Sequence, residues 1–228
     1  GVIELGASGV GEIAHTVAIT RPDVAILTNA GQAHLEGFGG YDKVVQAKGE
    51  IIDAVAPTGV VVLNRDDPAF EIWRDRAGTR RVIAVSASGH PDADYRYRQL
   101  QVERDGQTFV AEGPLGWEQT VHLGLYGEHN AGNALLAIAA ARELGAGDDA
   151  VTRGLASLKP VKGRLQVIHL SEQVRLVDDS YNANPASMRA ALKFLGSLPG
   201  YRIAVLGAMA ELGSEADELH REIGEFAR

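Results

Sequence analysis

VAILTNAGQAHLEGFGGYDKVVQAKGEIIDAV, residues 24–55, contains the pattern that decides the fold. The apolar run Val24–Leu27 predicts a strand at Val24–Thr28, a glycine-rich loop follows it, and the residues Tyr41–Val55 predict a helix. The next run, Gly59–Asn64, reads GVVVLN, and such a continuous β-branched run favours a strand that is covered on both faces. Strand, helix and strand in this order predict a parallel, doubly wound α/β sheet.

The rest of the chain extends this pattern and interrupts it once. Residues 95–125 alternate apolar and polar around an Asp105-Gly106 turn, which predicts antiparallel hairpins. LKPVKGR, residues 158–164, combines proline, glycine and basic residues, and we interpret it as a linker. The other expected strands are Val2–Leu5, Arg81–Val85, Val174–Asp178 and Tyr201–Leu206. The other expected helices are Ile13–Ile19, Glu71–Arg76, Asn130–Leu144, Val151–Ser157, Pro185–Leu195 and a last one from Glu215.

These elements define an expected α/β fold with two domains. Residues 1–160 form a mainly parallel, doubly wound sheet with an antiparallel hairpin region. Residues 161–228 restart the alternation as a truncated second α/β domain of the Rossmann-like kind. The sequence begins at Gly1 without methionine, and its last residues resemble a helix that simply stops, so we expect a piece of a longer chain.

Composition excludes several classes of function. Apolar residues make up 45% and charged residues 23%, as in ordinary globular proteins, and the net charge is −8. The negative charge disfavours a large nucleic-acid or anionic-membrane surface, and no apolar run is long enough to cross a membrane. The chain has no cysteine, which excludes disulfides and thiolate chemistry and is compatible with the cytoplasm. We therefore expect no nucleic-acid or membrane partner. We also expect a cytoplasmic monomer.

Lys48 lies inside an apolar stripe of the expected helix. Val44, Ile51 and Val55 share its helix face by i, i+4 and i, i+7 spacing. Such a lysine either extends along the edge of the core to keep its amine in water, or is held inward for a chemical role. Both interpretations stay open on the residues alone.

Glu4 and His34 are candidate metal ligands. Each follows or lies in an expected strand, and a carboxylate with an imidazole is a reasonable pair of ligands for a divalent cation. A single loop histidine is more often a local hydrogen-bonding group. The glycine-rich segment GASGVGE, residues 6–12, resembles a dinucleotide fingerprint only weakly, and no GK[ST] phosphate loop is present in the sequence.

Two further motifs place amides and carboxylates at helix starts. In GEHNAGN, residues 127–133, Asn130 and Asn133 share one side of a helix, where Asn130 is either an N-cap or, with Asn133, reads the edge of a purine base. In DDSYNANPASM, residues 178–188, Asn184 before proline is a good N-cap. The polar residues before it follow an expected strand, at the edge where α/β proteins bind ligands. Arg164 in the linker could reach a phosphate from either domain.

Taken together, these motifs resemble those of the Mur ligases. The resemblance covers nearly the whole chain and rests on a spaced set of motifs: IELGASGVGEI, ILTNAGQAHLEGFGGYDKVVQAKGEI, LNRDDP, GEHNAGNALLAIAAA, KGR, VDDSYNANPASMRAAL and AVLGAMAELG. AHLEGFG and DDSYNANP favour the family member that adds a dipeptide. Ala208 departs from the pattern, because the family usually has Asp there, and we assign that position no role.

The resemblance implies a reaction and its components. ATP would phosphorylate the terminal carboxylate of UDP-N-acetylmuramoyl-tripeptide, and the amine of D-alanyl-D-alanine would attack the acyl phosphate, with Mg²⁺ offsetting the negative charge. The product is a precursor of cell-wall peptidoglycan. In the family a GTxGKTT-type loop lies just upstream of the first motif, so we expect the 228-residue chain to be inactive by itself.

The resemblance also implies roles for individual residues. Glu4 and His34 would hold Mg²⁺, and Lys48 matches a lysine that is carbamylated in relatives and then also faces the metal. Lys48, His34 and Arg164 are the expected catalytic residues. The expected nucleotide-binding residues are Asn130 and Asn133 at the adenine, Arg164 at the phosphates and Asp179 at the ribose. The expected residues at the incoming dipeptide are Tyr181, Asn182 and Asn184.

Two other functions remain open on the sequence. The first is a sister Mur or folylpolyglutamate-type ligase of the same fold that adds a different amino acid. The second is a nucleotide-binding module without catalysis.

Overall fold

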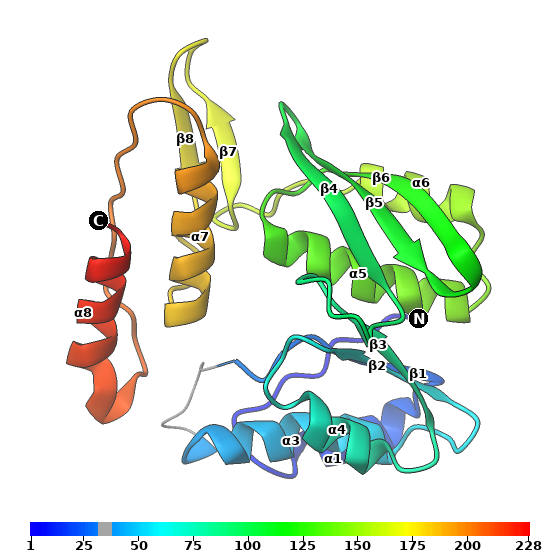
Figure 1. Ribbon diagram of the computed structural model, residues 1–228. Helices are drawn as coiled ribbons and strands as arrows, with labels where there is room; N and C mark the ends of the chain where they lie inside the picture. Colours follow the sequence, from blue (N-terminus) through cyan, green and yellow to red (C-terminus); the bar gives the residue numbers. More distant parts are fainter. Residues whose placement is uncertain (32–37) are drawn as a thin grey trace.

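The computed structural model describes residues 1–31 and 38–228 (Figure 1). The N-terminal half contains a parallel sheet with the strand order β1-β2-β3, in which Val24 pairs with Val60 and Val60 with Arg81. The strands are β1 (Val24–Leu27), β2 (Val60–Asn64) and β3 (Arg81–Val85). The sheet predicted from residues 24–64 is therefore present.

Both faces of this sheet are covered, as its apolar strands require. Val61 of β2 packs among side chains of α3 (Tyr41–Asp53) and α4 (Phe70–Ala77). Its neighbour Val62 points the other way, into a core shared with α5 (Glu128–Glu143). Figure 1 shows α3 and α4 on one side of the sheet and α5 on the other.

A second sheet covers the far side of α5. It is antiparallel, in the order β4-β5-β6, and α6 (Asp148–Ala156) packs against β6. The strands are β4 (Arg96–Glu103), β5 (Gly106–Gly113) and β6 (Trp117–Leu123). The turn before β5 requires glycine, because Gly106 has a φ of 148° and a Cβ there would collide with the carbonyl of Leu123.

The central helix α5 is buried on both sides because it lies between the two sheets. Its small residues let both sheets come close. Seven of its side chains are buried, and they are Ala131, Ala134, Leu135, Leu136, Ile138, Ala139 and Ala140. On the outside of the molecule, α1 (Glu12–Thr20) packs against α3.

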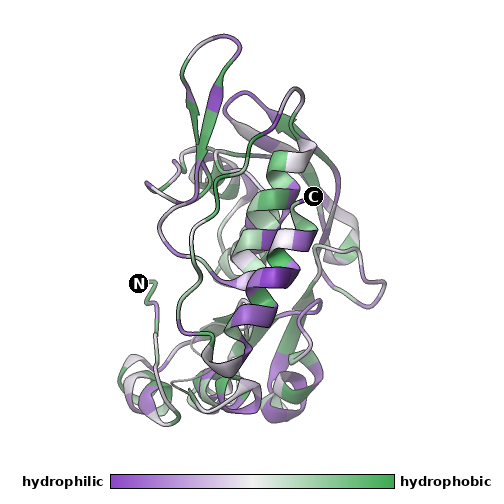
Figure 2. Cartoon of the chain, turned by 90° about the vertical axis from the view of Figure 1, so that its left-hand side faces the viewer, coloured by the Kyte–Doolittle hydropathy of each residue, from purple (hydrophilic) through white to green (hydrophobic). Residues whose placement is uncertain are grey.

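The C-terminal part consists of a hairpin and two helices. The antiparallel strands β7 (Gln166–His169) and β8 (Arg175–Asp178) precede α7 (Pro185–Ser197) and α8 (Ala216–Phe226). Figure 2 views the side of the molecule that carries α8 and the chain leading into it. Short 3-10 turns occur at Pro114–Gly116 and Gly213–Glu215. None of the described helices is long and apolar enough to cross a membrane.

An apolar cluster joins the C-terminal part to the rest of the molecule. Tyr126, which precedes α5, packs with Phe194 and Leu198 of α7 and with Leu165 of the linker end. The rings of Tyr126 and Phe194 lie 5.3 Å apart. The Tyr126 hydroxyl donates a hydrogen bond to the carbonyl of Arg104 at 2.5 Å. This cluster holds α7 beside the first turn of α5.

The predicted α/β class, with its parallel sheet and antiparallel hairpins, is confirmed, but three elements differ. The segments predicted as strands at 2–5 and 201–206 are extended chain outside any strand, and Val2, Tyr201 and Val205 are each more than nine-tenths exposed. An apolar run forms a strand only beside a partner strand, and among the described residues these two segments have none. Strand β7 was missed, and it pairs antiparallel with β8.

Candidate functional site

The loops at the carboxyl ends of the parallel strands are tied to one another. The side-chain amide of Asn64, at the end of β2, donates to the carbonyl of Thr28 after β1 at 2.8 Å. The buried Asp67 carboxylate accepts hydrogen bonds from the backbone N–H groups of Ala30 at 2.9 Å and Ala69 at 2.8 Å. These bonds fix the edge at which α/β proteins bind ligands.

Asp66 ties the loop after β3 to the same edge of the sheet. Its carboxylate accepts hydrogen bonds from the hydroxyls of Ser86 and Ser88, both at 2.6 Å, and from the N–H groups of Ala87 and Ser88. Burial is the largest influence on this carboxyl and opposes ionisation, yet the hydrogen bonds together lower its pKa below the ordinary value. Asp66 is therefore an ionised anchor for the loop after β3.

Lys48 points into this edge from α3. Its Nζ atom donates to the carbonyl of Asn29, directly after β1, at 2.9 Å, and the residue is half-buried. Burial lowers the pKa of Lys48, and the charge of Asp67 opposes that shift in part. The amine consequently loses its proton more readily than an exposed lysine would.

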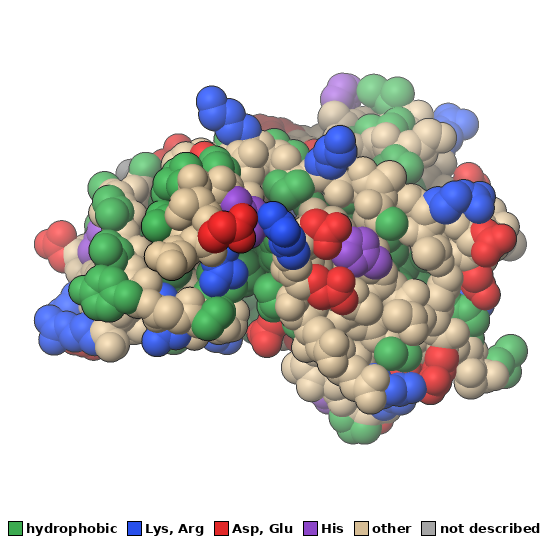
Figure 3. Space-filling view, turned by 90° about the horizontal axis from the view of Figure 1, so that it is seen from above, with side chains coloured by type: hydrophobic (Ala, Val, Ile, Leu, Met, Phe, Trp, Pro, Cys, Tyr) green, Lys and Arg blue, Asp and Glu red, His purple; other side chains and the backbone are tan. Residues whose placement is uncertain are grey.

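The two other expected metal ligands are Glu4 and His34. Glu4 is exposed in the extended segment before α1, and His34 lies outside the described residues. Among the described residues, one group of three potential ligands has its atoms within 4.8 Å of one another: Glu103, Asp105 and His122. This group lies on the surface of the β4–β6 sheet, and Figure 3 looks onto the end of the molecule where the β4–β5 and β7–β8 turns lie.

The first turn of α5 lies at the same edge of the sheet as Lys48. A Cβ placed on Gly132 would be 3.3 Å from Ala87, in the loop after β3. Gly127 is the N-cap, so the interpretation of Asn130 as an N-cap is wrong. The Asn130 amide instead donates to the carbonyl of Tyr126 at 2.7 Å, whereas Asn133 is exposed.

Arg164, Asp179 and Tyr181 form one cluster at the end of the linker. The Arg164 guanidinium lies over the Tyr181 ring, 4.5 Å from its centroid. The Asp179 carboxylate accepts a hydrogen bond from the N–H of Leu165 at 2.8 Å, and the N–H of Tyr181 donates to the carbonyl of Gly163 at 2.9 Å. The structure therefore brings together three of the residues that the sequence singled out.

The amides of Asn182 and Asn184 serve the local chain. Asn184 is the N-cap of α7 and forms a capping box with Ser187, with hydrogen bonds of 2.9 and 3.0 Å. The carbonyl oxygen of the Asn182 side chain accepts a hydrogen bond from the N–H of Ala183 at 2.8 Å. Helix initiation thus accounts for Asn184 in this structure.

A cleft of about 670 Å³ separates the first turn of α5 from α7. Glu128 and His129 line it on the α5 side, and Arg189, Lys193 and Phe194 line it on the α7 side. Burial lowers the pKa of His129, while the charges of Asp179 and Glu128 oppose that shift. The sequence analysis missed His129, although its position beside Asn130 at a helix start marked it.

An α/β sheet with polar groups at its carboxyl edge, and a second α/β part docked beside it, places the protein among α/β proteins that bind ligands at strand ends. Two family profiles match the chain, the Mur ligase middle domain over residues 1–141 and the Mur ligase, glutamate ligase domain over residues 163–228. The chain belongs to the Mur ligase family.

Individual relatives agree with this assignment. The chain is 44% identical over 227 residues to UDP-N-acetylmuramoyl-tripeptide–D-alanyl-D-alanine ligase of Escherichia coli (strain K12), with 100% of the chain and 50% of the relative covered. A crystal structure of MurF from Acinetobacter baumannii superimposes with a TM-score of 0.90 at 34% identity, covering 99% of this chain and 49% of that one. MurF ligase from Thermotoga maritima in complex with ADP gives a TM-score of 0.86 at 33% identity, covering 98% and 50%. The chain thus spans about half the length of the relatives it matches.

Proposed function

We propose that the chain is part of an ATP-dependent ligase that joins D-alanyl-D-alanine to the peptide carboxylate of UDP-N-acetylmuramoyl-tripeptide and releases ADP. The observation that carries this proposal is the 44% identity to the Escherichia coli ligase along the entire chain. The product is a peptidoglycan precursor, so the protein would serve cell-wall synthesis and, through it, cell shape and division.

The two parts of the chain would act as two domains. Residues 1–160 form the central domain, which contains Lys48 at the carboxyl edge of the parallel sheet. Residues 161–228 form the first part of the C-terminal ligase domain. The antiparallel hairpin region belongs to the first domain, because it shares a core with α5. We further infer a monomer, and a cytoplasmic location, which the nucleotide substrates support.

Lys48 would act as a carbamate. Its lowered pKa and its inward direction favour a neutral amine, which takes up CO₂ and releases one proton to give a carbamate anion. An unmodified lysine amine has no oxygen for Mg²⁺, whereas a carbamate has the hard oxygen atoms that this ion prefers. The carbamate would hold Mg²⁺ together with Glu4 and His34. Held by these residues, Mg²⁺ would offset negative charge on the phosphates and on the attacked carboxyl.

The nucleotide would lie between α5 and the linker end. Asn130 and Asn133 would face the adenine from the first turns of α5, beside the cleft to α7. Arg164 would reach the phosphates, and Asp179 the ribose. The Arg164 guanidinium already stacks on an exposed ring and is not held by a described carboxylate, so it can exchange that contact for phosphate oxygens.

The incoming dipeptide would contact the segment before α7. Tyr181 and Asn182 are exposed there, and Asn184 supports the segment by initiating the helix. In this arrangement Tyr181 and Asn182 contact substrate directly, and Asn184 contributes mainly through the position of the backbone.

Release of ADP by the full-length protein tests this function. We expect ADP release that requires both D-alanyl-D-alanine and UDP-N-acetylmuramoyl-tripeptide, measured with each substrate omitted in turn. Turnover with a single amino acid or glutamate in place of the dipeptide would instead identify a sister ligase. Binding of ATP without turnover for any acceptor would identify a non-catalytic nucleotide-binding module.

A further inference from the structure

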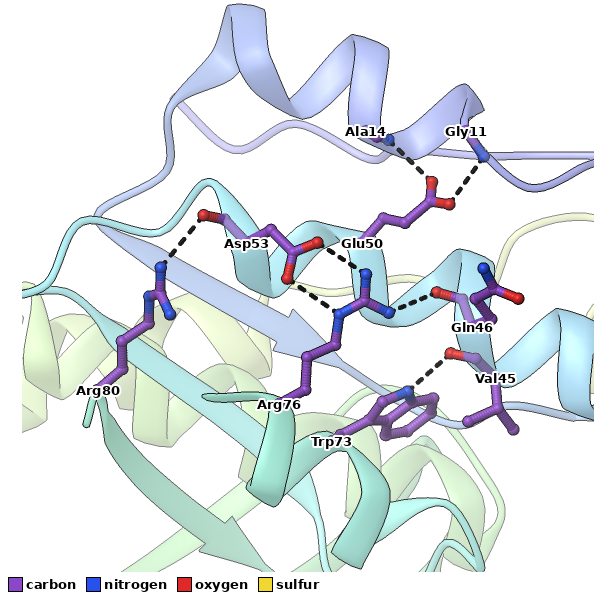
Figure 4. Close-up of polar contacts among 9 residues, drawn as sticks. All are labelled: Gly11, Ala14, Val45, Gln46, Glu50, Asp53, Trp73, Arg76 and Arg80. Atoms are coloured by element: carbon purple, nitrogen blue, oxygen red, sulfur yellow. Dashed lines mark hydrogen bonds and ion pairs between the residues drawn. The ribbon is translucent and has the colours of Figure 1, made fainter. Parts of the chain in front are cut away.

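The carboxylate of Glu50 is buried and connects helix α3 to helix α1. The proposed function does not explain this contact. Glu50 lies in α3, two residues after Lys48, and only 5% of it is exposed. One of its carboxylate oxygens accepts a hydrogen bond from the N–H of Gly11 at 2.7 Å, and the other from the N–H of Ala14 at 3.0 Å (Figure 4). These amides belong to the N-cap residue and to the third residue of α1.

These two hydrogen bonds replace a cap that α1 lacks. The first amides of a helix have no partner within the helix, and the N-terminal end carries a partial positive charge. Gly11 is the N-cap of α1 and offers no side chain. A buried carboxylate in turn needs charge-compensating donors. Glu50 and the start of α1 therefore satisfy each other, although they are 36 to 39 residues apart in sequence.

A neighbouring side of α3 is fastened to α4. Arg76 donates to the Asp53 carboxylate at 2.9 and 2.7 Å and to the carbonyl of Gln46 at 2.8 Å (Figure 4). Trp73 donates to the carbonyl of Val45 at 3.0 Å. Gly49 makes this approach possible, because a Cβ there would lie 2.7 Å from Arg76 and 3.1 Å from Trp73.

Helix α3 is thus fastened to α4 by Arg76 and Trp73 and to α1 by Glu50. We propose that Glu50 is a positioning residue that fixes α1, and with it the glycine-rich segment 6–11, to the helix that carries Lys48. The segment is consequently not an anion-binding loop, because an internal carboxylate occupies the helix end that follows it. Only the effect on turnover rests on the proposed ligase function.

Amide hydrogen exchange in the full-length protein tests the contact without reference to activity. We expect Glu50→Ala to speed exchange of the Gly11 and Ala14 amides by at least about tenfold, because two hydrogen bonds to a charged group are lost. Added formate should slow this exchange again in part, because it can enter the space that the Glu50 side chain vacates. Asp75→Ala removes an exposed carboxylate of α4 and should leave both amides unchanged. Unchanged exchange in Glu50→Ala would overturn the proposal.

Glu50→Gln keeps one acceptor oxygen and most of the side-chain volume, so it decides the question if Glu50→Ala does not fold. It should speed exchange of at least one of the two amides, and parental exchange at both would also overturn the proposal. In ligation assays we expect kcat to fall about tenfold or more, with KM for ATP nearly unchanged and formate restoring part of kcat in Glu50→Ala. Parental kcat in a variant with faster exchange would refute the positioning role. A parent without ligation would refute the proposed function instead, and the exchange experiment would still decide on Glu50.

Discussion

Lys48 and Arg164 are two basic side chains in contrasting environments. Lys48 is half-buried and donates to a backbone carbonyl at the edge of a sheet where the buried Asp67 carboxylate ties two loops. Arg164 is exposed, and it rests on Tyr181, a ring that is itself 66% exposed. The first environment changes the chemistry of the amine, and the second only directs a guanidinium whose charge is permanent. This difference predicts where substitutions alter reactivity and where they alter binding.

The largest effect is expected at Lys48. In the full-length protein, Lys48→Arg keeps the positive charge but cannot take up CO₂, so we expect kcat to fall by about 10² to 10³-fold, as for other lost groups that stabilise developing charge. Lys48→Ala should be equally impaired and regain part of its activity with added acetate, measured at fixed Mg²⁺ and ionic strength. Near-parental turnover of Lys48→Arg would exclude the carbamate.

The second largest effect is expected at Asp67, which holds the loops beside Lys48 in place. Asp67→Ala removes the acceptor of the Ala30 and Ala69 amides inside the protein, and we expect a loss of about 3 kcal/mol in the free energy of unfolding. Denaturant titration of the variant and the parent measures it. Asp75→Ala is the matched control, since that carboxylate is exposed, and a loss of equal size in the control would contradict the assignment.

Substitutions in the cluster of Arg164, Asp179 and Tyr181 should change stability less than Asp67→Ala does. Their clearer effect should be on the binding of ATP. Asp179→Ala removes the acceptor of the Leu165 amide, and we expect about 1 kcal/mol of destabilisation together with a higher KM for ATP. Arg164→Lys should likewise raise KM for ATP, because an ammonium does not reproduce the planar, bidentate contact. A change in kcat alone in both variants would contradict the prediction that this cluster acts on binding while Lys48 acts on reactivity.

The smallest expected effect is a pH dependence at His129. Burial lowers its pKa from the ordinary 6.5, so the folded protein resists protonation of this ring while the unfolded chain does not. Stability should therefore fall as the pH drops from about 6.5 towards the lowered value. His129→Gln should flatten that part of the stability curve, measured by thermal unfolding at a series of pH values. An unchanged slope in the variant would show that another group titrates there.

The sequence was sufficient for elements whose local pattern and partners agree. The β-branched run at residues 59–64 and the helix at 41–55 formed as predicted, because each buries an apolar face that the period of its residues reveals. The same reasoning misplaced strands at 2–5 and 201–206, since apolarity does not show whether a neighbouring strand exists. The strand β7, Gln166–His169, was missed, although β1 and β8, which are equally short, were predicted.

The candidate site was predictable by residue type and less by arrangement. Lys48 stood out as a charge within an apolar stripe, and the cluster of Arg164, Asp179 and Tyr181 came from motifs on either side of one linker. Glu50 was missed, although it is also a charged residue in the same helix. Its partners are backbone amides of α1, and backbone groups leave no trace in the residue types of a sequence.

The position of α5 between two sheets has a consequence for how this protein folds. The helix contributes side chains to a single core that also takes in strands from both sheets, with Val62 on one side and Phe109 on the other. Neither sheet can bury its inner face until α5 is in place, and α5 is too rich in alanine to bury much surface against one sheet alone. We therefore expect the parallel sheet, the antiparallel sheet and α5 to unfold in one cooperative transition, whereas α8, whose own cluster is small, can detach before it.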